Sequence, residues 1–372
     1  MASRSQSRSP TTSPSTTSSP TNESESKSVT ESVYKFPKEN GRTYHGYRAG
    51  TYHFPNDPSE IDRLDFQYEI LKYCFTNRNY FAPLKNPRRI FDIGTGTGQW
   101  AIETGDEFPD AEVQATDLSP IQPKDVPENV QFFIDDASEE DWALPPEYFD
   151  YIHTRVLLGC FTDFREIIKR AFYYCAPGGY MESQEIMSTL CCDDGTMPPD
   201  YPFLEWNRYL EDAAMQAGRS IRIANKMKRW YSEAGFMDVQ EKTFKLPINP
   251  WPRDKHLNTL GKMQEDNWMA GLAGISMGLF SRIFCWSKTE IEVYLVNVRK
   301  SISDKRVHAY HRVHVVWGRK PFPGEQPGDA ALSTGAATAV QSYANTSRSE
   351  SLGSDFMNNH NLAGNVPTND NL

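Results

Sequence analysis

A short, mostly apolar segment that leads into three closely spaced glycines limits the folds open to this chain. Residues 89–93 read Arg-Ile-Phe-Asp-Ile, which is typical of a short buried strand, and Gly94, Gly96 and Gly98 follow at intervals of two. A helix is expected over about residues 99–107. Glycines between a strand and a helix let backbone N–H groups approach a polar or anionic ligand at the positive end of the helix dipole. The segment therefore predicts a ligand-binding turn at the edge of a parallel sheet.

Strands and helices alternate from this turn onward, which indicates a parallel sheet covered by helices on both faces. Further strands are expected at residues 112–116, 130–134, 149–154, 180–184, 239–246 and 311–317, with a helical insertion at about 250–305 between the last two. The connections in the first half are only a few residues long, as is normal for an α/β unit. The sequence therefore predicts a Rossmann-like α/β fold with a seven-stranded, mostly parallel sheet.

The two ends of the chain differ in composition from the part that is expected to fold. Residues 1–33 contain eighteen Ser or Thr and no aromatic residue, so they cannot bury enough apolar surface to offset their conformational entropy. Residues 324–372 are rich in Ala, Ser, Asn and Gly and show no sustained apolar period. We therefore expect one large domain over residues 34–323, between two disordered tails.

The charge balance and the cysteines limit the classes of partner. The formal net charge is −10, of which −6 remains on the expected domain when the tails are set aside. An acidic domain disfavours direct nucleic-acid binding, because such affinity comes mainly from neutralised phosphates.

The six cysteines form no C-x-x-C pair, so we expect reduced thiols and no metal site. No apolar stretch is long enough to span a bilayer, so we expect a soluble protein of the nucleus or cytoplasm.

A carboxylate two residues ahead of the first glycine decides between two cofactor classes. Residues 96–101 also satisfy the G-x-G-x-x-G/A dinucleotide pattern, so the glycines alone leave both classes open. Asp92 would oppose a pyrophosphate, whereas S-adenosylmethionine (SAM) presents an ammonium and a sulfonium and no phosphate. The pattern D-x-G-x-G-x-G is typical of class I methyltransferases, so the sequence favours SAM as the cofactor.

The ends of the next two strands supply further candidates for the cofactor site. Asp117, at the end of the second strand, is placed to accept hydrogen bonds from both ribose hydroxyls. Asp136 and Ala137 follow the third strand and are expected to meet the amino group and a ring nitrogen of adenine. Leu118 offers an apolar surface for the adenine ring, and Trp142 is either a second such surface or a core residue.

Two side chains share one face of the fourth strand near its carboxyl end, where ligands bind in such sheets. They are His153 and Arg155. His153 is a candidate catalytic base or orienting hydrogen-bond donor, with a structural histidine as the alternative. Glu182 and Glu185, at the end of the fifth strand, are either pocket residues or capping and solvated acids. The basic residues between 219 and 229 are expected to form the solvated face of a helix, with a nuclear-localisation or phosphate-binding patch as the alternative.

Several sequence blocks outside the glycine turn resemble the fungal LaeA-like methyltransferases. The blocks are Glu39-Asn-Gly-Arg-Thr-Tyr44-His-Gly-Tyr47-Arg-Ala-Gly50, Pro55-Asn-Asp57, Asp62-Arg-Leu-Asp65, Ala115-Thr-Asp-Leu-Ser-Pro-Ile-Gln122, His153-Thr-Arg155 and Pro177-Gly-Gly-Tyr180. The resemblance covers about residues 34–320, and the blocks ahead of the first helix are more specific than the glycine turn. Within the family the chain looks closer to the velvet-associated VipC/VapB type than to LaeA itself.

The resemblance implies a SAM-dependent methyltransferase that influences fungal development and secondary metabolism from the nucleus or cytoplasm. It implies a velvet-family or paralogous methyltransferase partner, or a link to chromatin. It gives the reaction class but no acceptor; the negative charge of the domain favours a small molecule or a basic protein segment. It also implies that the block around Tyr44 packs near the cofactor, where an aromatic ring can contact the sulfonium.

Two functional hypotheses of different class follow. In the first, an active methyltransferase uses the insertion at 253–300 as a lid over the acceptor pocket, with Trp268 and Met277 in its apolar wall. In the second, a regulatory module binds SAM but acts by docking onto partners, with tails that fold on binding or are phosphorylated. A dehydrogenase is a third and more distant alternative.

Overall fold

The computed structural model describes residues 31–326, so the two expected tails lie almost entirely outside the described residues. The helices are α1 (Pro58–Cys74), α2 (Gln99–Glu107), α3 (Phe164–Tyr174), α4 (Pro202–Gln216), α5 (Met227–Ala234), α6 (Lys255–Ile283) and α7 (Lys288–Ile302), with short 3-10 helices at Glu31–Tyr34 and Ala224–Lys226. The strands are β1 (Lys38–Glu39), β2 (Arg42–Thr43), β3 (Arg89–Ile93), β4 (Glu112–Asp117), β5 (Val130–Ile134), β6 (Phe149–Arg155), β7 (Cys175–Ile186), β8 (Met237–Pro247) and β9 (Tyr310–Arg319).

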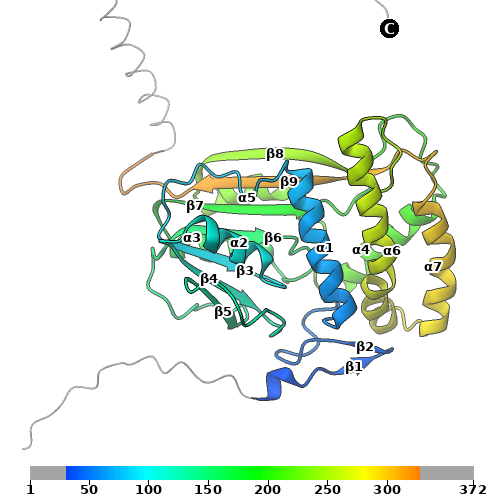
Figure 1. The fold of residues 1–372 in the computed structure, drawn as a ribbon, viewed down its shortest axis with the longest axis horizontal. Helices are drawn as coiled ribbons and strands as arrows, with labels where there is room; N and C mark the ends of the chain where they lie inside the picture. Colours follow the sequence, from blue (N-terminus) through cyan, green and yellow to red (C-terminus); the bar gives the residue numbers. More distant parts are fainter. Residues whose placement is uncertain (1–30, 327–372) are drawn as a thin grey trace, which may run out of the picture.

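One seven-stranded sheet forms the centre of the molecule (Figure 1). Its order is β5-β4-β3-β6-β7-β9-β8. The first five strands are mutually parallel, and β9 lies antiparallel between β7 and β8. The expected seven-stranded, mostly parallel sheet is confirmed. The strand order places the carboxyl ends of β3, β4 and β6 side by side, where open α/β sheets bind ligands.

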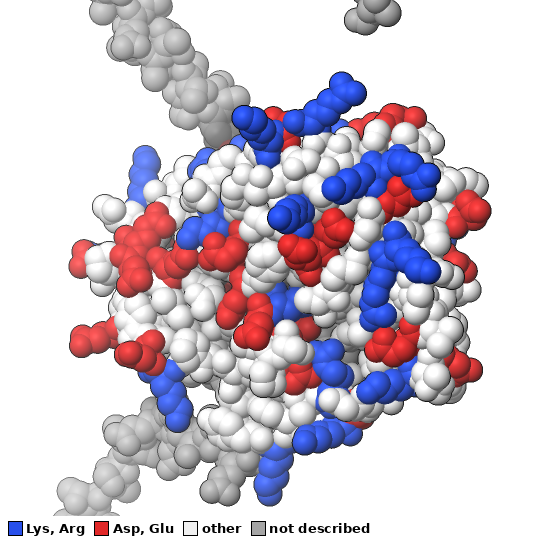
Figure 2. Space-filling view, turned by 45° about the vertical axis from the view of Figure 1, so that its right-hand side comes forward, with Lys and Arg blue, Asp and Glu red and all other residues white. Residues whose placement is uncertain are grey.

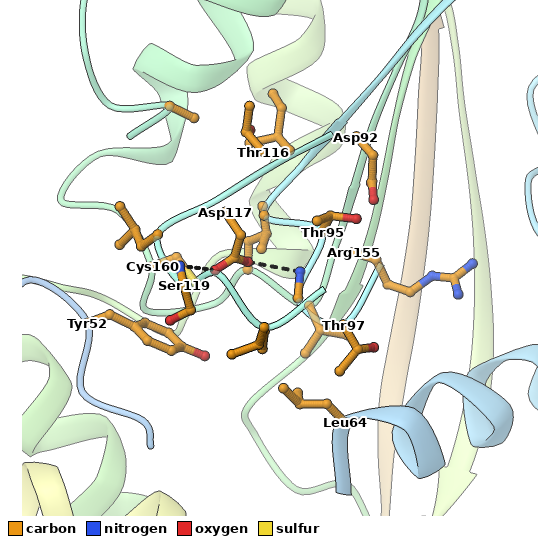
Figure 3. Close-up of a pocket in the computed structure, with 18 of the residues that line it drawn as sticks. Tyr52, Leu64, Asp92, Thr95, Thr97, Thr116, Asp117, Ser119, Arg155 and Cys160 are labelled. Carbon is orange, nitrogen blue, oxygen red and sulfur yellow. Dashed lines mark hydrogen bonds between the residues drawn. The ribbon is translucent and has the colours of Figure 1, made fainter. Parts of the chain in front are cut away.

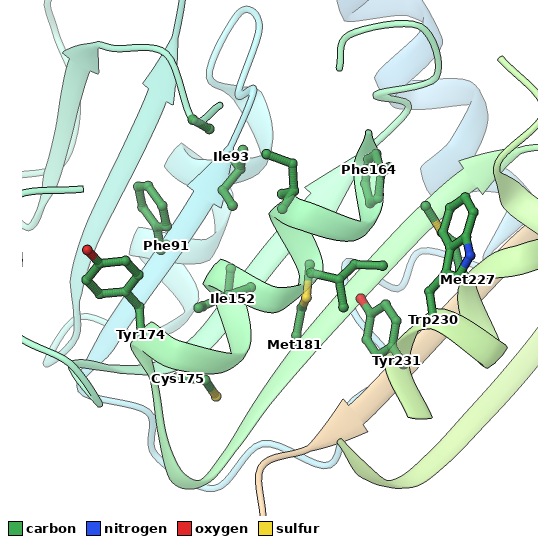
Figure 4. Close-up of a cluster of buried hydrophobic side chains, with 14 of the residues drawn as sticks. Phe91, Ile93, Ile152, Phe164, Tyr174, Cys175, Met181, Met227, Trp230 and Tyr231 are labelled. Carbon is green, nitrogen blue, oxygen red and sulfur yellow. The ribbon is translucent and has the colours of Figure 1, made fainter. Parts of the chain in front are cut away.

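Apolar clusters attach helices to both faces of the sheet. On one face, α3 and α5 pack over β3, β6 and β7 through side chains such as Ile168, Met181 and Tyr231, all of them fully buried (Figure 4). On the other face, Ile90 and Tyr151 pack with Trp100 of α2. Neighbouring residues of a strand therefore belong to opposite clusters, as Ile90 and Phe91 do on β3, which a sheet covered on both faces requires.

The expected helical insertion between the last two strands is confirmed as α6 and α7, which lie between β8 and β9 in the chain. Together with α4 they form a separate helical layer beyond the ends of the strands (Figure 1). The three helices share an apolar cluster, to which α4 contributes Trp206, α6 contributes Leu272 and α7 contributes Leu295. Because α1 packs on α6, this layer also supports the helix that faces the ligand-binding edge of the sheet.

Candidate cofactor and active site

A pocket lies at the carboxyl ends of β3, β4 and β6 and faces α1 (Figure 3). The glycine turn after β3 and the ends of β4, β5 and β6 form its floor. Residues 51–56, ahead of α1, and the α1 residues Leu64, Gln67 and Leu71 close the opposite side. The pocket therefore combines the edge predicted from the sequence with a cover that comes from the preceding segment.

The three glycines of the turn serve two different purposes. Gly94 and Gly96 line the pocket with φ of +68° and +60°. A Cβ at Gly96 would meet nothing within 4 Å, so its backbone leaves room for a ligand. Gly98 does not line the pocket and instead begins α2 with φ +85°, where a Cβ would lie 2.5 Å from Cζ of Phe132. The prediction that Gly98 contacts the cofactor is therefore corrected to a packing role.

Asp117 is held by the backbone of the glycine turn. Its carboxylate accepts hydrogen bonds from the N–H groups of Gly96 and Ser119, each at 2.9 Å. Burial raises the pKa of Asp117 to about 6, against the lowering effect of these backbone hydrogen bonds. The carboxylate lines the pocket, as the sequence predicted, in a fixed orientation at the end of β4.

The other candidates for the adenine side divide between pocket and core. Leu118, Asp136 and Ala137 line the pocket beside Asp117. Trp142 does not line the pocket and packs against Phe91, with its indole N–H donating to the carbonyl of Ala137 at 3.1 Å. Trp142 is therefore a core residue that supports the loop of Asp136 and Ala137 from behind.

Asp92 and His153 form a buried pair at the bottom of the pocket. They face each other in the register of β3 and β6, and His153 Nδ1 lies 2.7 Å from Oδ1 of Asp92. The ring of His153 stacks on Trp100 with 3.7 Å between centroids. Burial lowers the pKa of His153 to about 4, so the ring is neutral near pH 7 and donates its Nδ1–H to the carboxylate.

The sequence matches known methyltransferases over most of its length. Residues 66–241 match a family model described as a methyltransferase domain. The chain is 37% identical to methyltransferase pytC of Aspergillus terreus over 294 residues, which is 78% of this chain and 90% of that protein. It is 32% identical to the secondary metabolism regulator LAE1 of Cochliobolus heterostrophus, over 76% of this chain and 94% of that protein. Identity to the protein-methionine methyltransferase laeA of Emericella nidulans is 31%, over 77% of each chain.

The chain belongs to the LaeA-like methyltransferases. It is accordingly a class I methyltransferase whose cofactor is SAM. The dehydrogenase alternative is excluded by these matches, and the carboxylate ahead of the first glycine decided between the two cofactor classes correctly.

One expected contact of this LaeA-like methyltransferase is wrong. Tyr44 does not line the pocket; its buried ring packs beside Gly278 of α6, with the guanidinium of Arg282 4.7 Å from the ring centroid. The aromatic residue that the same segment brings to the pocket is Tyr52, eight positions later. The segment covers the pocket as the resemblance implied, but the residue assigned from it was the wrong one.

The proposed lid is also wrong. No residue between 253 and 300 lines the pocket of this LaeA-like methyltransferase. Trp268 and Met277 instead belong to the apolar cluster that joins α6 to α4 and α7. Helix α6 supports the pocket through α1, where Arg63 donates a hydrogen bond to Oδ1 of Asn267 at 3.1 Å, and through the segment ahead of α1, where Gly274 lies close to Pro55. The insertion is therefore a support for α1 and not a cover of the acceptor site.

Glu182 and Glu185 are fully buried acids that do not line the pocket. Oε2 of Glu182 accepts hydrogen bonds from the N–H groups of Phe81 and Ala82, at 2.8 and 2.7 Å. Glu185 accepts the N–H of Leu157 at 2.8 Å, and burial raises its pKa to about 8. Glu185 thus holds the loop after β6, whose Leu157 lines the pocket, and Glu182 holds the loop between α1 and β3. Neither is a role expected from the sequence.

The basic stretch after α4 is mostly solvated, with one exception that sequence reasoning missed. Arg222, Lys226, Lys228 and Arg229 are exposed, whereas the half-buried Arg219 lines the pocket and donates a hydrogen bond to the carbonyl of Cys160. On the face shown in Figure 2, Lys and Arg are interspersed with Asp and Glu and form no continuous basic stripe.

Within residues 31–326 no helix is long and apolar enough to cross a membrane. The same part of the chain holds no group of three or more His, Cys, Asp or Glu side chains suited to a metal ion. Its six cysteines are all free thiols.

Proposed function

We propose that the pocket holds SAM along the edge formed by β3, β4 and β5. Asp117 would accept the ribose hydroxyls, and Asp136 with Ala137 would meet the adenine edge, with Leu118 against the ring. Asp92 would attract the ammonium of the methionine part across the open backbone at Gly96. The arrangement of these five pocket-lining positions around one glycine turn supports the assignment.

Unfilled hydrogen-bonding atoms in the pocket wall support a polar ligand of this kind. Four buried side-chain atoms have no partner: Oδ1 of Asn56, Oγ1 of Thr95, Nε2 of His153 and Nη1 of Arg155. Buried polar atoms without a partner are uncommon because each costs free energy, so a ligand or ordered water is the usual explanation. The convergence of donors and acceptors on one pocket is the observation that carries the proposal.

When bound, SAM supplies the activated methyl group, and the protein contributes position and exclusion of water. His153 fits a positioning role better than that of a proton acceptor for the substrate. Its ring is fully buried between Trp100 and Asp92, and its hydrogen bond fixes the carboxylate that faces the ligand. The role of His153 as a catalytic base thus stays a prediction without a supporting contact.

We further propose that this methyltransferase acts in the control of fungal secondary metabolism and development, on a small-molecule or protein acceptor. Its similarity to the secondary metabolism regulator LAE1 and to the methyltransferase laeA supports this role. A velvet-type or paralogous partner and a place in the nucleus or cytoplasm are part of the same proposal, and they rest on the family resemblance alone.

Labelled SAM tests the activity directly. The purified full chain is incubated with labelled SAM and fractionated extract of the source cells, and label is counted separately in protein and in small molecules. Gly96→Glu should abolish transfer, because its side chain would occupy the open space at the turn. Gly195→Glu is a matched control: its φ is +73°, it also has open space around it, and it lies outside the pocket lining.

Transfer that persists in Gly96→Glu would contradict the proposed site. The regulatory alternative makes a different forecast in cells. If cells that carry Gly96→Glu behaved as wild type, while removal of the segments outside 31–326 changed their metabolite profile, docking without catalysis would replace the enzymatic role.

A further inference from the structure

Arg155, the last residue of β6, presents an unused hydrogen-bond donor inside the pocket wall. Its Nε donates to Oε1 of Gln184 at 2.7 Å, and its Nη2 donates to the carbonyl of Asn79 at 3.0 Å. The guanidinium also lies 5.2 Å from the ring centroid of Tyr68. These contacts fix the plane of the guanidinium, yet Nη1 is buried and has no partner.

The charge of this guanidinium has no carboxylate in direct contact. Among residues 31–326, no Asp or Glu oxygen lies within the 4.0 Å of an ion pair with Arg155. Its hydrogen-bond acceptors are an amide oxygen and a backbone carbonyl, both neutral. A cation in a pocket wall with a preset planar fork and one free donor is suited to a carboxylate.

A complementary group lies two residues back on the same face of β6. His153 faces the pocket there with its own unpartnered atom, Nε2, which is an acceptor because Nδ1 carries the proton shared with Asp92. Figure 3 shows Asp92 and Arg155 on one side of the pocket, away from Asp117 and Tyr52. This side of the pocket therefore has hydrogen-bond acceptors at Asp92 and His153 beside a cationic donor at Arg155.

This combination matches a free amino acid, which carries an ammonium and a carboxylate on one carbon. We propose that Arg155 binds the α-carboxylate of the methionine part of SAM, while the Asp92–His153 pair binds its ammonium. The inference rests on the proposed cofactor site and extends it, because it makes the cofactor's carboxylate a requirement for binding. The other source of a carboxylate would be the methyl acceptor.

Wild-type protein is sufficient for the first test. Calorimetry compares S-adenosylhomocysteine (SAH), the product form of the cofactor, with decarboxylated SAH, which keeps the ammonium and lacks only the carboxylate. We expect decarboxylated SAH to bind about 10- to 100-fold more weakly, the range expected when a charge-assisted hydrogen bond in a buried site is lost. Equal affinities would overturn the proposal and leave the SAM site intact.

A variant test assigns the effect to Arg155. Arg155→Met should weaken SAH by the same factor but leave 5′-methylthioadenosine, which lacks the whole amino-acid part, within about twofold of wild type. Arg155→Lys, which keeps the charge without the fork, should fall between the two. Arg219→Met is the matched control, because it removes the other pocket-lining arginine. In this variant the ratio of the affinity for SAH to that for 5′-methylthioadenosine should stay as it is in wild type.

The possible outcomes separate the two proposals. If SAH and 5′-methylthioadenosine both fail to bind the wild-type protein, the SAM site itself is wrong. If both bind and Arg155→Met leaves the affinity for SAH unchanged, only the role of Arg155 is wrong, and a carboxylate on the acceptor becomes the better explanation of its free donor. Loss of affinity for both ligands in Arg155→Met would indicate a collapsed pocket and would also count against a specific carboxylate contact.

Discussion

Oδ1 of Asp92 and Nδ1 of His153 lie 2.7 Å apart between two central strands, with the pair almost completely buried. From the sequence, we predict separate roles for these residues: Asp92 as a cofactor ligand and His153 as a candidate base. Their hydrogen bond unites them, because the imidazole fixes the carboxylate and the carboxylate fixes the tautomer. A change at either residue is therefore expected to act on the same property, the orientation of the negative charge toward the ligand.

The pKa of His153 makes the folded protein sensitive to acid. Because burial lowers this pKa to about 4 in the folded state, the unfolded chain binds more protons between about pH 4 and pH 6.5. The free energy of unfolding that depends on a neutral His153 is therefore fully present above the unfolded pKa of about 6.5, and it is lost as the pH falls toward 4. We expect His153→Asn to reduce the acid loss in the free energy of unfolding by up to about 3 kcal/mol.

Urea unfolding at several pH values between about 4 and 7 measures this effect. An identical pH slope in His153→Asn and wild type would show that the acid loss arises elsewhere. His311, whose pKa burial also lowers to about 4, would then be the next candidate.

The raised pKa of Asp117 predicts a pH dependence of cofactor binding. In the proposed site, ribose hydroxyls would donate to the ionised carboxylate of Asp117, which is the minor form below about pH 6 in the free protein. We expect the affinity for SAH to be constant above pH 7 and to fall by as much as about tenfold per pH unit below pH 6. In Asp117→Asn the affinity should be weak and should no longer change over this range. A wild-type affinity that is flat from pH 7 to 5 would contradict the assigned contact.

The fold and the floor of the pocket could be predicted because their signals are local in sequence. A single β-α-β unit contains the strand that carries Asp92, the turn at Gly94 and Gly96, and the acid at Asp117. Short connections leave such a unit few ways to pack, so spacing along the chain becomes position in space. The same reasoning correctly placed Asp136 and Ala137 on the next strand end.

The cover of the pocket could not be predicted, because it depends on contacts between distant segments. Tyr44 and Tyr52 are both aromatic residues of one irregular segment, and only their packing against α6 decides which of them faces the ligand. Tyr44 fits beside Gly278, more than two hundred residues later in the chain. Arg219 likewise belongs to a basic run whose other members are exposed, so its composition indicated a solvated face.

The glycines of the turn predict two distinguishable phenotypes. Gly98→Ala would place a Cβ 2.5 Å from the ring of Phe132 at φ +85°, so we expect it to destabilise the protein by about 2 kcal/mol or more. In Gly96→Ala the new Cβ meets no atom within 4 Å, so the free energy of unfolding should fall only by the cost of a left-handed alanine, about 1 kcal/mol. The same methyl group would enter the pocket and lower the affinity for SAH. Thermal unfolding and calorimetry separate the two effects. If Phe132→Leu fails to restore part of the stability of Gly98→Ala, the steric explanation is wrong.

The buried ion pair of α1 tests whether the helical layer supports the pocket. Arg63 donates to Glu60 at 2.7 Å and to Asn267 of α6 at 3.1 Å, and both members of the ion pair are less than one-tenth exposed. Arg63→Met removes the nearest cation and leaves the buried carboxylate of Glu60 with only Arg42, at 3.9 Å, so we expect a cost of about 3 kcal/mol.

The double variant Glu60→Gln with Arg63→Met removes both charges and should recover much of that stability. It still lacks the link from α1 to Asn267 of α6. If α6 positions α1 over the pocket, the double variant will be stable yet bind SAH several-fold more weakly than wild type. Calorimetry on Glu292→Gln, a change on the outer helix α7, provides the control. Wild-type affinity in the stable double variant would show that α1 holds its position without α6.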